Sequence, residues 1–128
     1  MHIRSLHVSL PVELSNPPRE FSLLPFWFWN DHLENREILR QIDDFEQHGV
    51  FGFVIHPRMG LPREMRFMSD AMLDHMQVAI EAAARKNMKV ILYDEGMYPS
   101  GSASGQVVAA NPAYHCRCVD REIGRAHV

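Results

Sequence analysis

The sequence predicts an α/β protein in which three parallel strands alternate with two helices. Two observations lead to this fold class. Short apolar segments begin near Phe26, Phe51 and Val90, and each ends in polar residues. Amphipathic helical segments fill the two intervals between them. This alternation is typical of right-handed βαβ crossovers and a parallel sheet, either open and doubly wound or closed as a (β/α)8 barrel.

The first βα unit begins after Pro25. Residues 26–29 are apolar at every position, which predicts a strand buried on both faces. Asn30 and Asp31 end the strand and are expected to cap the next helix, with Glu34 in a capping-box arrangement. The helix is expected to end at Gly49 and to carry its apolar side chains on one face, namely Leu33, Ile38, Leu39, Ile42 and Phe45.

Two further strands follow. The apolar run at residues 51–55 predicts the second strand, which is followed by His56, Pro57 and Arg58. Ser69 or Asp70 is expected to cap the second helix. Residues 90–93 predict the third strand, and a loop then leads into a short helix over residues 106–110.

The chain divides into three regions. Residues 1–24 predict an irregular leader interrupted by prolines, with at most a short edge strand over residues 8–14. Residues 25–114 form the expected partial (β/α) barrel domain. Residues 115–128 are an atypical tail that loses the apolar periodicity. Cys116 and Cys118 in this tail are too close for an ordinary intrachain disulfide and lack partner ligands for zinc.

Composition excludes several classes of function. The 128 residues carry a net charge of −3, which offers no basic surface for nucleic acid. No apolar run approaches the roughly 20 residues of a membrane span. Residues 1–20 lack the features of a signal peptide, so a cytoplasmic location is the default expectation.

The polar residues that follow the strands predict a ligand site. Carboxyl ends of parallel strands meet at one edge of the sheet, where active sites of α/β proteins form. The candidate substrate-binding residues at this edge are Trp29, Asn30, His56, Arg58, Asp94 and Glu95. The turn after the first strand lacks the glycines of a dinucleotide fingerprint, which argues against a Rossmann domain.

Several of these residues have a second interpretation. Trp29 either fills a barrel interior or forms a flat platform for a sugar ring. Arg58 either contacts ligand or forms a structural ion pair with Asp94 or Glu95. The two adjacent carboxylates are a poor acid/base pair, because neighbours on a strand face opposite sides and glycosidase carboxyl groups lie about 5–10 Å apart.

Metal binding is a rival use of the same residues. His56 with Asp94 or Glu95 would supply ligands from two strand ends to a divalent ion. The chain shows no close histidine spacing that sharpens this hypothesis, so no metal ligands are assigned.

Three motifs occur in order along the chain: PFWFWN at residues 25–30, GFVIHPRMGL at residues 52–61 and LYDEGMYPSG at residues 92–101. Together they resemble the start of the catalytic barrel in large bacterial glycoside hydrolases of the α-L-rhamnosidase type, family 106 and its relatives. The resemblance covers about residues 24–112.

The resemblance implies a (β/α)8 barrel that binds a carbohydrate substrate at its C-terminal face and hydrolyses glycosidic bonds. The chain would then hold the first three strands of a truncated barrel, inactive alone, with the six candidate residues in or beside the sugar pocket. The resemblance does not identify the catalytic residues of this chain, and Glu95 is the one candidate for a catalytic role. No cofactor is expected, although calcium has a role in enzymes of this type; an oligomer would cover the open sheet edge.

Two other functions remain as alternatives. The first is a carbohydrate-binding or assembly module without catalysis. The second is a metal-dependent hydrolase that uses His56 and Asp94.

Overall fold

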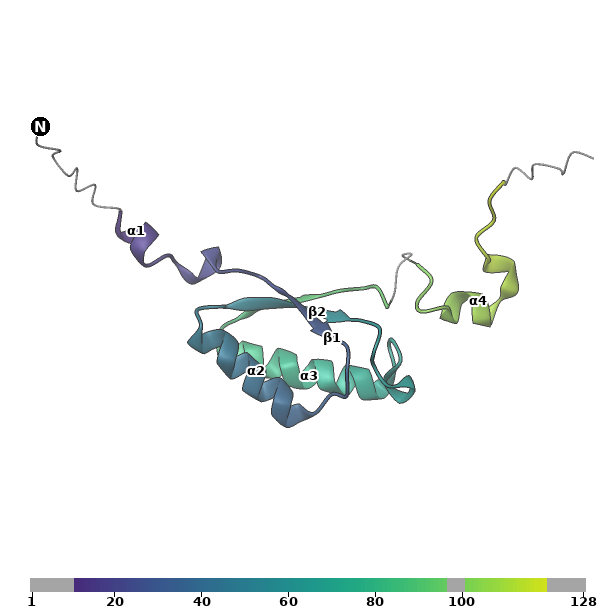
Figure 1. Ribbon diagram of the computed structural model, residues 1–128, viewed down its shortest axis with the longest axis horizontal. Helices are drawn as coiled ribbons and strands as arrows, with labels where there is room; N and C mark the ends of the chain where they lie inside the picture. The colour runs from purple at the N-terminus through teal and green to yellow at the C-terminus, as the bar shows by residue number, and fades with distance from the viewer. Residues whose placement is uncertain (1–10, 97–100, 120–128) are drawn as a thin grey trace, which may run out of the picture.

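A computed structural model gives the structure of the protein and describes residues 11–96 and 101–119. Strands β1 (Phe26–Trp29), β2 (Gly52–Pro57) and β3 (Lys89–Leu92) form a parallel sheet in the order β1-β2-β3. Helices α2 (Asn35–Gln47) and α3 (Asp70–Arg85) connect the strands and lie side by side on one face of the sheet (Figure 1). The predicted α/β class and βαβαβ order are confirmed, and the sheet is not closed within the described residues.

β2 is the central strand and sets the register of both neighbours. Phe28 of β1 lies opposite His56 of β2, and Val54 lies opposite Ile91 of β3. Backbone hydrogen bonds extend the pairing past the strand ends, because the Tyr93 amide donates to the Ile55 carbonyl at 3.1 Å. This register brings the carboxyl ends of β2 and β3 level with each other.

The core fills the space between the sheet and the two helices. Phe53 of β2, Ile42 of α2 and Met72 of α3 are fully buried there. The ring of Trp27 packs edge-on against Phe53, with ring centroids 5.0 Å apart. Its indole nitrogen donates a hydrogen bond of 2.7 Å to the side-chain oxygen of Gln41, so β1 is joined to α2 by both packing and a polar contact.

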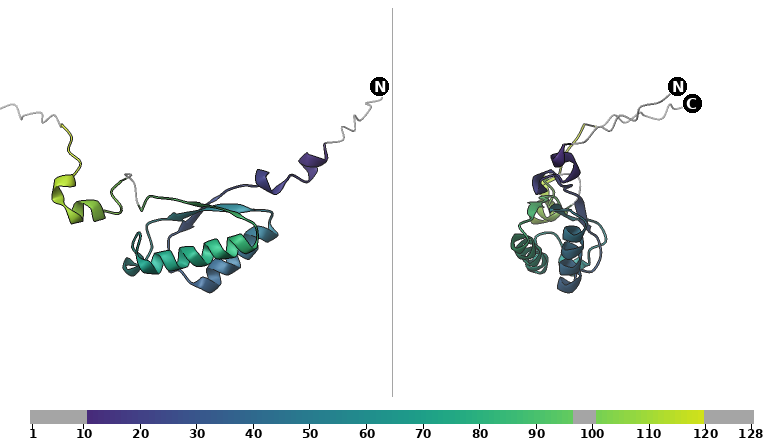
Figure 2. Two further views of the ribbon diagram at one scale, coloured as in Figure 1. Left: turned by 180° about the vertical axis from the view of Figure 1, so that it is seen from behind. Right: turned by 90° about the vertical axis from the view of Figure 1, so that its left-hand side faces the viewer.

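The opposite face of the sheet is not covered by any described element, as Figure 1 and the left view in Figure 2 show. Phe26 and Phe28 of β1 are 55% and 51% exposed there, and Ile91 of β3 is 46% exposed. The expectation that β1 is buried on both faces is therefore wrong. Only its alternate residues face the helices, and no second layer within residues 11–96 and 101–119 packs on the rest.

The helix ends depart from expectation at one point. α2 begins at Asn35, and its N-cap residue Glu34 makes no side-chain cap. Asp31 is not the cap, because its carboxylate accepts the amide of His32 at 2.7 Å, and such local bonds compete with helix formation. The two other predicted helix boundaries hold: Gly49 follows α2 with a φ of +74°, and the Ser69 hydroxyl caps α3. The strand boundaries differ from the predicted ones, because β2 includes His56 and Pro57, and β3 ends before Tyr93.

The flanking segments form short helices outside the sheet. α1 (Val12–Ser15) and the 3-10 helix η1 (Arg19–Phe21) precede β1. The edge strand predicted over residues 8–14 is wrong for residues 11–14. These residues form a helical turn, in which the Leu14 amide donates a hydrogen bond of 2.9 Å to the Pro11 carbonyl. Residues 8–10 lie outside the described residues. The 3-10 helix η2 (Arg63–Met65) interrupts the loop before α3, and α4 (Gln106–Ala110) and the 3-10 helix η3 (Pro112–Tyr114) follow β3. α4 is the helix that the sequence predicts.

Two further findings concern the described ranges as a whole. None of the helices found in residues 11–96 and 101–119 has both the length and the apolar character needed to cross a membrane. Cys116 and Cys118 are exposed and form no disulfide.

The fold depends on the face of α2 that packs against the sheet. Ile42→Ala should lower the free energy of unfolding by about 2–5 kcal/mol, because the side chain is fully buried and leaves a cavity. Leu39→Ala on the same helix is the matched control and should cost less than about 1 kcal/mol, since Leu39 is 37% exposed. Urea denaturation measures both values, and equal costs would contradict this packing.

Candidate functional site

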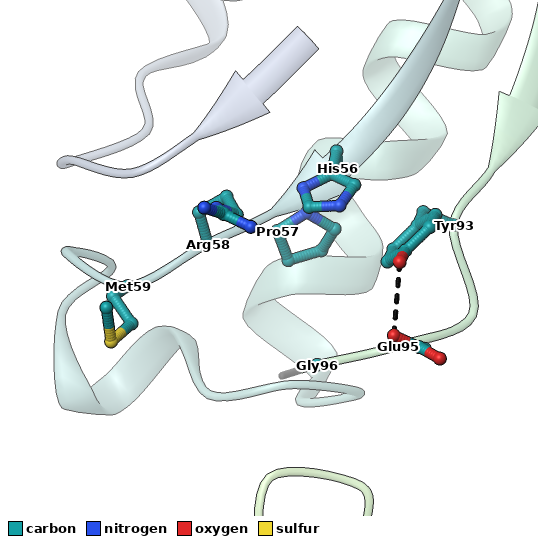
Figure 3. A pocket seen from close by; sticks show the side chains of 7 residues that line it. All are labelled: His56, Pro57, Arg58, Met59, Tyr93, Glu95 and Gly96. Atoms are coloured by element: carbon teal, nitrogen blue, oxygen red, sulfur yellow. Dashed lines mark hydrogen bonds between the residues drawn. The ribbon is translucent and has the colours of Figure 1, made fainter. Parts of the chain in front are cut away.

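An open cavity of about 480 Å³ lies at the carboxyl ends of β2 and β3. Its lining side chains come from both strand ends and are drawn in Figure 3: His56, Pro57, Arg58, Met59, Tyr93, Glu95 and Gly96. Three of the six residues predicted from the sequence therefore meet in one place, namely His56, Arg58 and Glu95. The parallel register explains this, because it aligns the two strand ends.

The other three predicted residues lie elsewhere. Trp29 faces the helices and is 2% exposed, so its ring is part of the core and offers no platform to a ligand. Trp29 and Asn30 line a separate cavity of about 90 Å³ between β1 and α2. Asp94 is exposed and does not line the cavity that holds Glu95.

His56 is a buried polar residue surrounded by rings. It is 6% exposed, and its imidazole centroid lies 4.0 Å from that of Tyr93, 5.1 Å from Phe28 and 5.3 Å from Phe26. Its Nδ1 atom is buried with no hydrogen-bond partner among the described residues. Burial, and next the charge of Arg58, lower the pKa of His56, so the imidazole is neutral at pH 7.

Arg58 is exposed beside this ring cluster. Its guanidinium carbon lies 5.3 Å from the centroid of the Phe28 ring, which is a cation–π arrangement. Arg58 forms no ion pair with Asp94, Glu95 or any other residue that the structure describes. The structural ion pair considered from the sequence is therefore not formed, and the guanidinium is open to a ligand.

Tyr93 and Glu95 form a hydrogen-bonded pair at the other side of the cavity. The phenol hydroxyl donates to Oε2 of Glu95 at 3.1 Å, as the dashed line in Figure 3 shows. This bond to the carboxylate is the main reason that the pKa of Tyr93 is raised, so the phenol keeps its proton. The Glu95 carboxylate is thus held as an acceptor that faces the cavity.

Sequence reasoning assigned Tyr93 to a strand and missed it as a cavity residue. The alternation of side chains between the two faces of a strand would have identified Tyr93 as a cavity residue. Phe28 and His56 are paired in the sheet, and Tyr93 packs on His56 in the same layer of side chains. A strict period of two along the three strands would have placed these three rings together.

Two glycines hold the surrounding loops in close contact. Gly60 has a φ of +115°, and a Cβ atom there would collide with the carbonyl oxygen of Asn30. A Cβ atom at Gly96 would lie 2.6 Å from Cγ of Phe67 and would also collide with the hydroxyl of Ser104. The loop after β2 is therefore packed tightly against the turn after β1 and the segment after β3.

The groups that line the cavity are able to form both hydrogen bonds and apolar contacts with a polar organic molecule. The cavity presents a carboxylate, a guanidinium and a neutral imidazole beside an aromatic ring and a thioether. Within the described parts of the chain, no group of three or more His, Cys, Asp or Glu side chains is arranged to hold a metal ion. His56 and Asp94, which the sequence suggests as metal ligands, therefore have no third His, Cys, Asp or Glu side chain among the described residues to complete a metal site with them.

Comparisons with protein-family models, with curated proteins and with solved structures find no significant match to this chain. We therefore infer its function from the residues of the cavity.

The first prediction for the site concerns the pKa of His56. The imidazole should titrate below its ordinary value of about 6.5, because burial and Arg58 disfavour the charged form. Arg58→Gln removes one of these causes and should raise the pKa of His56. Arg85→Gln, at an exposed position on α3, is the control and should leave it unchanged. NMR titration of the imidazole protons measures each value.

The same shift predicts a pH dependence of stability. Because the folded pKa lies below the unfolded value, the unfolded chain binds more protons between the two. The contribution of His56 to stability is complete above about pH 6.5 and is lost as the pH falls through the folded pKa. His56→Gln should lack this component, so identical pH profiles of unfolding free energy for both proteins would contradict the buried neutral imidazole.

Proposed function

We propose that the chain contributes sugar-binding residues to a (β/α)8-barrel glycoside hydrolase that acts on α-L-rhamnosides or related sugars. The observation that carries this proposal is the cavity at the carboxyl ends of β2 and β3, where Arg58, Tyr93 and Glu95 converge. Ligands of (β/α)8-barrel enzymes bind at this end of the strands. The motifs that resemble family 106 contain the same residues.

The sheet itself supports a barrel. Its strands are ordered β1-β2-β3 as in the chain, and both connecting helices cover the same face. The other face carries apolar side chains, with Phe26, Phe28 and Ile91 about half exposed. A barrel places helices outside and packs layers of apolar side chains inside, so the uncovered face is suited to become a barrel interior.

The lining of the cavity fits a 6-deoxy sugar. A carboxylate such as Glu95 accepts strong hydrogen bonds from neighbouring hydroxyl groups, and Arg58 donates to hydroxyl oxygens. The Tyr93 ring offers a flat apolar surface to the C–H face of a sugar ring. Met59 and Pro57 add an apolar wall for the methyl group that distinguishes rhamnose from a hexose with a 6-hydroxyl.

Hydrolysis needs more than this cavity provides. A glycosidase uses two carboxyl groups that flank the scissile bond. Glu95 is the single carboxylate among the described lining residues, so we assign it to substrate binding and keep it as the one candidate for catalysis. The second carboxyl group would come from another strand of the barrel, and the chain alone should bind the sugar without hydrolysing it.

Substitution of the carboxylate tests the binding role. Glu95→Gln should weaken binding of an aryl α-L-rhamnoside by about tenfold or more, because a charged acceptor is lost. Asp94→Asn is the matched control, since Asp94 is the adjacent carboxylate outside the cavity, and it should change affinity by less than about twofold. NMR titration measures both dissociation constants.

Two results would contradict the proposal. Equal effects of Glu95→Gln and Asp94→Asn would show that the cavity is not the sugar site. Rapid release of the aryl group by the 128-residue chain would show that it already holds both catalytic carboxyl groups.

A further inference from the structure

A second cavity adjoins the candidate sugar cavity on the side of the loop after β2. Its volume is about 180 Å³, and it shares Pro57, Arg58, Met59 and Gly96 with the first cavity. The loop between β2 and α3 supplies most of the remaining lining, including Arg63 and Arg66. A ligand in the first cavity would therefore be able to extend into the second without leaving the protein surface.

The second cavity is positively charged. Three arginines line it, namely Arg58, Arg63 and Arg66, and no Asp or Glu does so among the described residues. None of the three guanidinium groups forms an ion pair or a hydrogen bond with another described residue. This grouping contrasts with the net charge of −3 of the whole chain.

The loop that carries these arginines is held in place. Arg63 belongs to η2, and Gly60 packs against the Asn30 carbonyl. At the far end of the loop, the Phe67 carbonyl accepts a hydrogen bond of 2.7 Å from the Gln106 side chain. The guanidinium groups are thus presented on a backbone that does not need to be ordered by the ligand, which favours binding.

We propose that the second cavity binds the anionic substituent of an acidic saccharide whose neutral 6-deoxy sugar occupies the first cavity. Guanidinium groups bind carboxylates and sulfates through paired, charge-assisted hydrogen bonds. The anion is either the carboxylate of an adjoining uronic acid or a sulfate ester, and both suit the same arginines. This inference rests on the proposed function and specifies its substrate class.

The test compares four probes by NMR titration or calorimetry. These are methyl α-L-rhamnoside, a rhamnosyl-glucuronate disaccharide, the methyl ester of that disaccharide, and a sulfated methyl rhamnoside. The disaccharide acid should bind about tenfold more tightly than its neutral ester, or the sulfated rhamnoside should bind about tenfold more tightly than the unsulfated one. The advantage should shrink as the salt concentration rises.

Paired variants locate the effect. Arg63→Gln combined with Arg66→Gln should remove the preference for the anionic probe and leave the affinity for methyl α-L-rhamnoside unchanged. Arg36→Gln combined with Arg85→Gln removes the same charge from exposed positions on α2 and α3 and should retain the preference. Proton–nitrogen NMR spectra of each variant verify that the fold is unchanged.

The outcomes separate the two proposals. Equal affinities for the anionic and neutral probes, or a preference that survives loss of Arg63 and Arg66, would overturn the acidic-saccharide inference and leave rhamnoside binding intact. Arginine-dependent binding of the two anionic probes, with no binding of methyl α-L-rhamnoside or of the neutral ester, would support the anion cavity and contradict the proposed function. Failure to bind any of the four probes would contradict both.

Discussion

Parallel pairing of β2 with both of its neighbours is the constraint on which the rest of the structure depends. It places Phe28 opposite His56 and continues through the hydrogen bond from the Tyr93 amide to the Ile55 carbonyl. With this register, the residues after β2 and β3 emerge at the same level and form one cavity. A slip of one residue would turn His56 toward the helices and Ile55 away from them, which would lose both the core and the site.

The side chains on the two faces of the sheet have different roles. Side chains on the helix side, such as Trp27 and Phe53, join the strands to α2 and α3 and supply the packing that stabilises the unit. Side chains on the open side, Phe26 and Phe28 among them, surround the imidazole of His56 and lower its pKa by excluding water. The open face therefore surrounds one buried imidazole with aromatic rings, beside the more exposed charged groups of the cavity.

Local signals in the sequence were sufficient for the strand–helix order and for the cap at Ser69, because apolar runs and capping chemistry act over a few residues. They were not sufficient to predict that the Trp29 side chain faces the helices, since a strand that is apolar at every position does not reveal which of its residues do so. Local signals were also insufficient to predict that Arg58 forms no ion pair with any described residue. Ion pairing of Arg58 depends on where side chains distant in sequence lie in three dimensions, and so does the packing of the loop after β2 against the turn after β1, where Gly60 closely approaches Asn30.

The central claim is that a sugar binds in the cavity between the ends of β2 and β3. Intermolecular nuclear Overhauser effects between methyl α-L-rhamnoside and the protein test it most directly. We predict contacts from the sugar methyl and ring protons to Tyr93 and Met59, which line opposite parts of the cavity in Figure 3. Contacts to the helix-facing ring of Trp29 instead, or none to Tyr93 and Met59 at a saturating sugar concentration, would contradict the account.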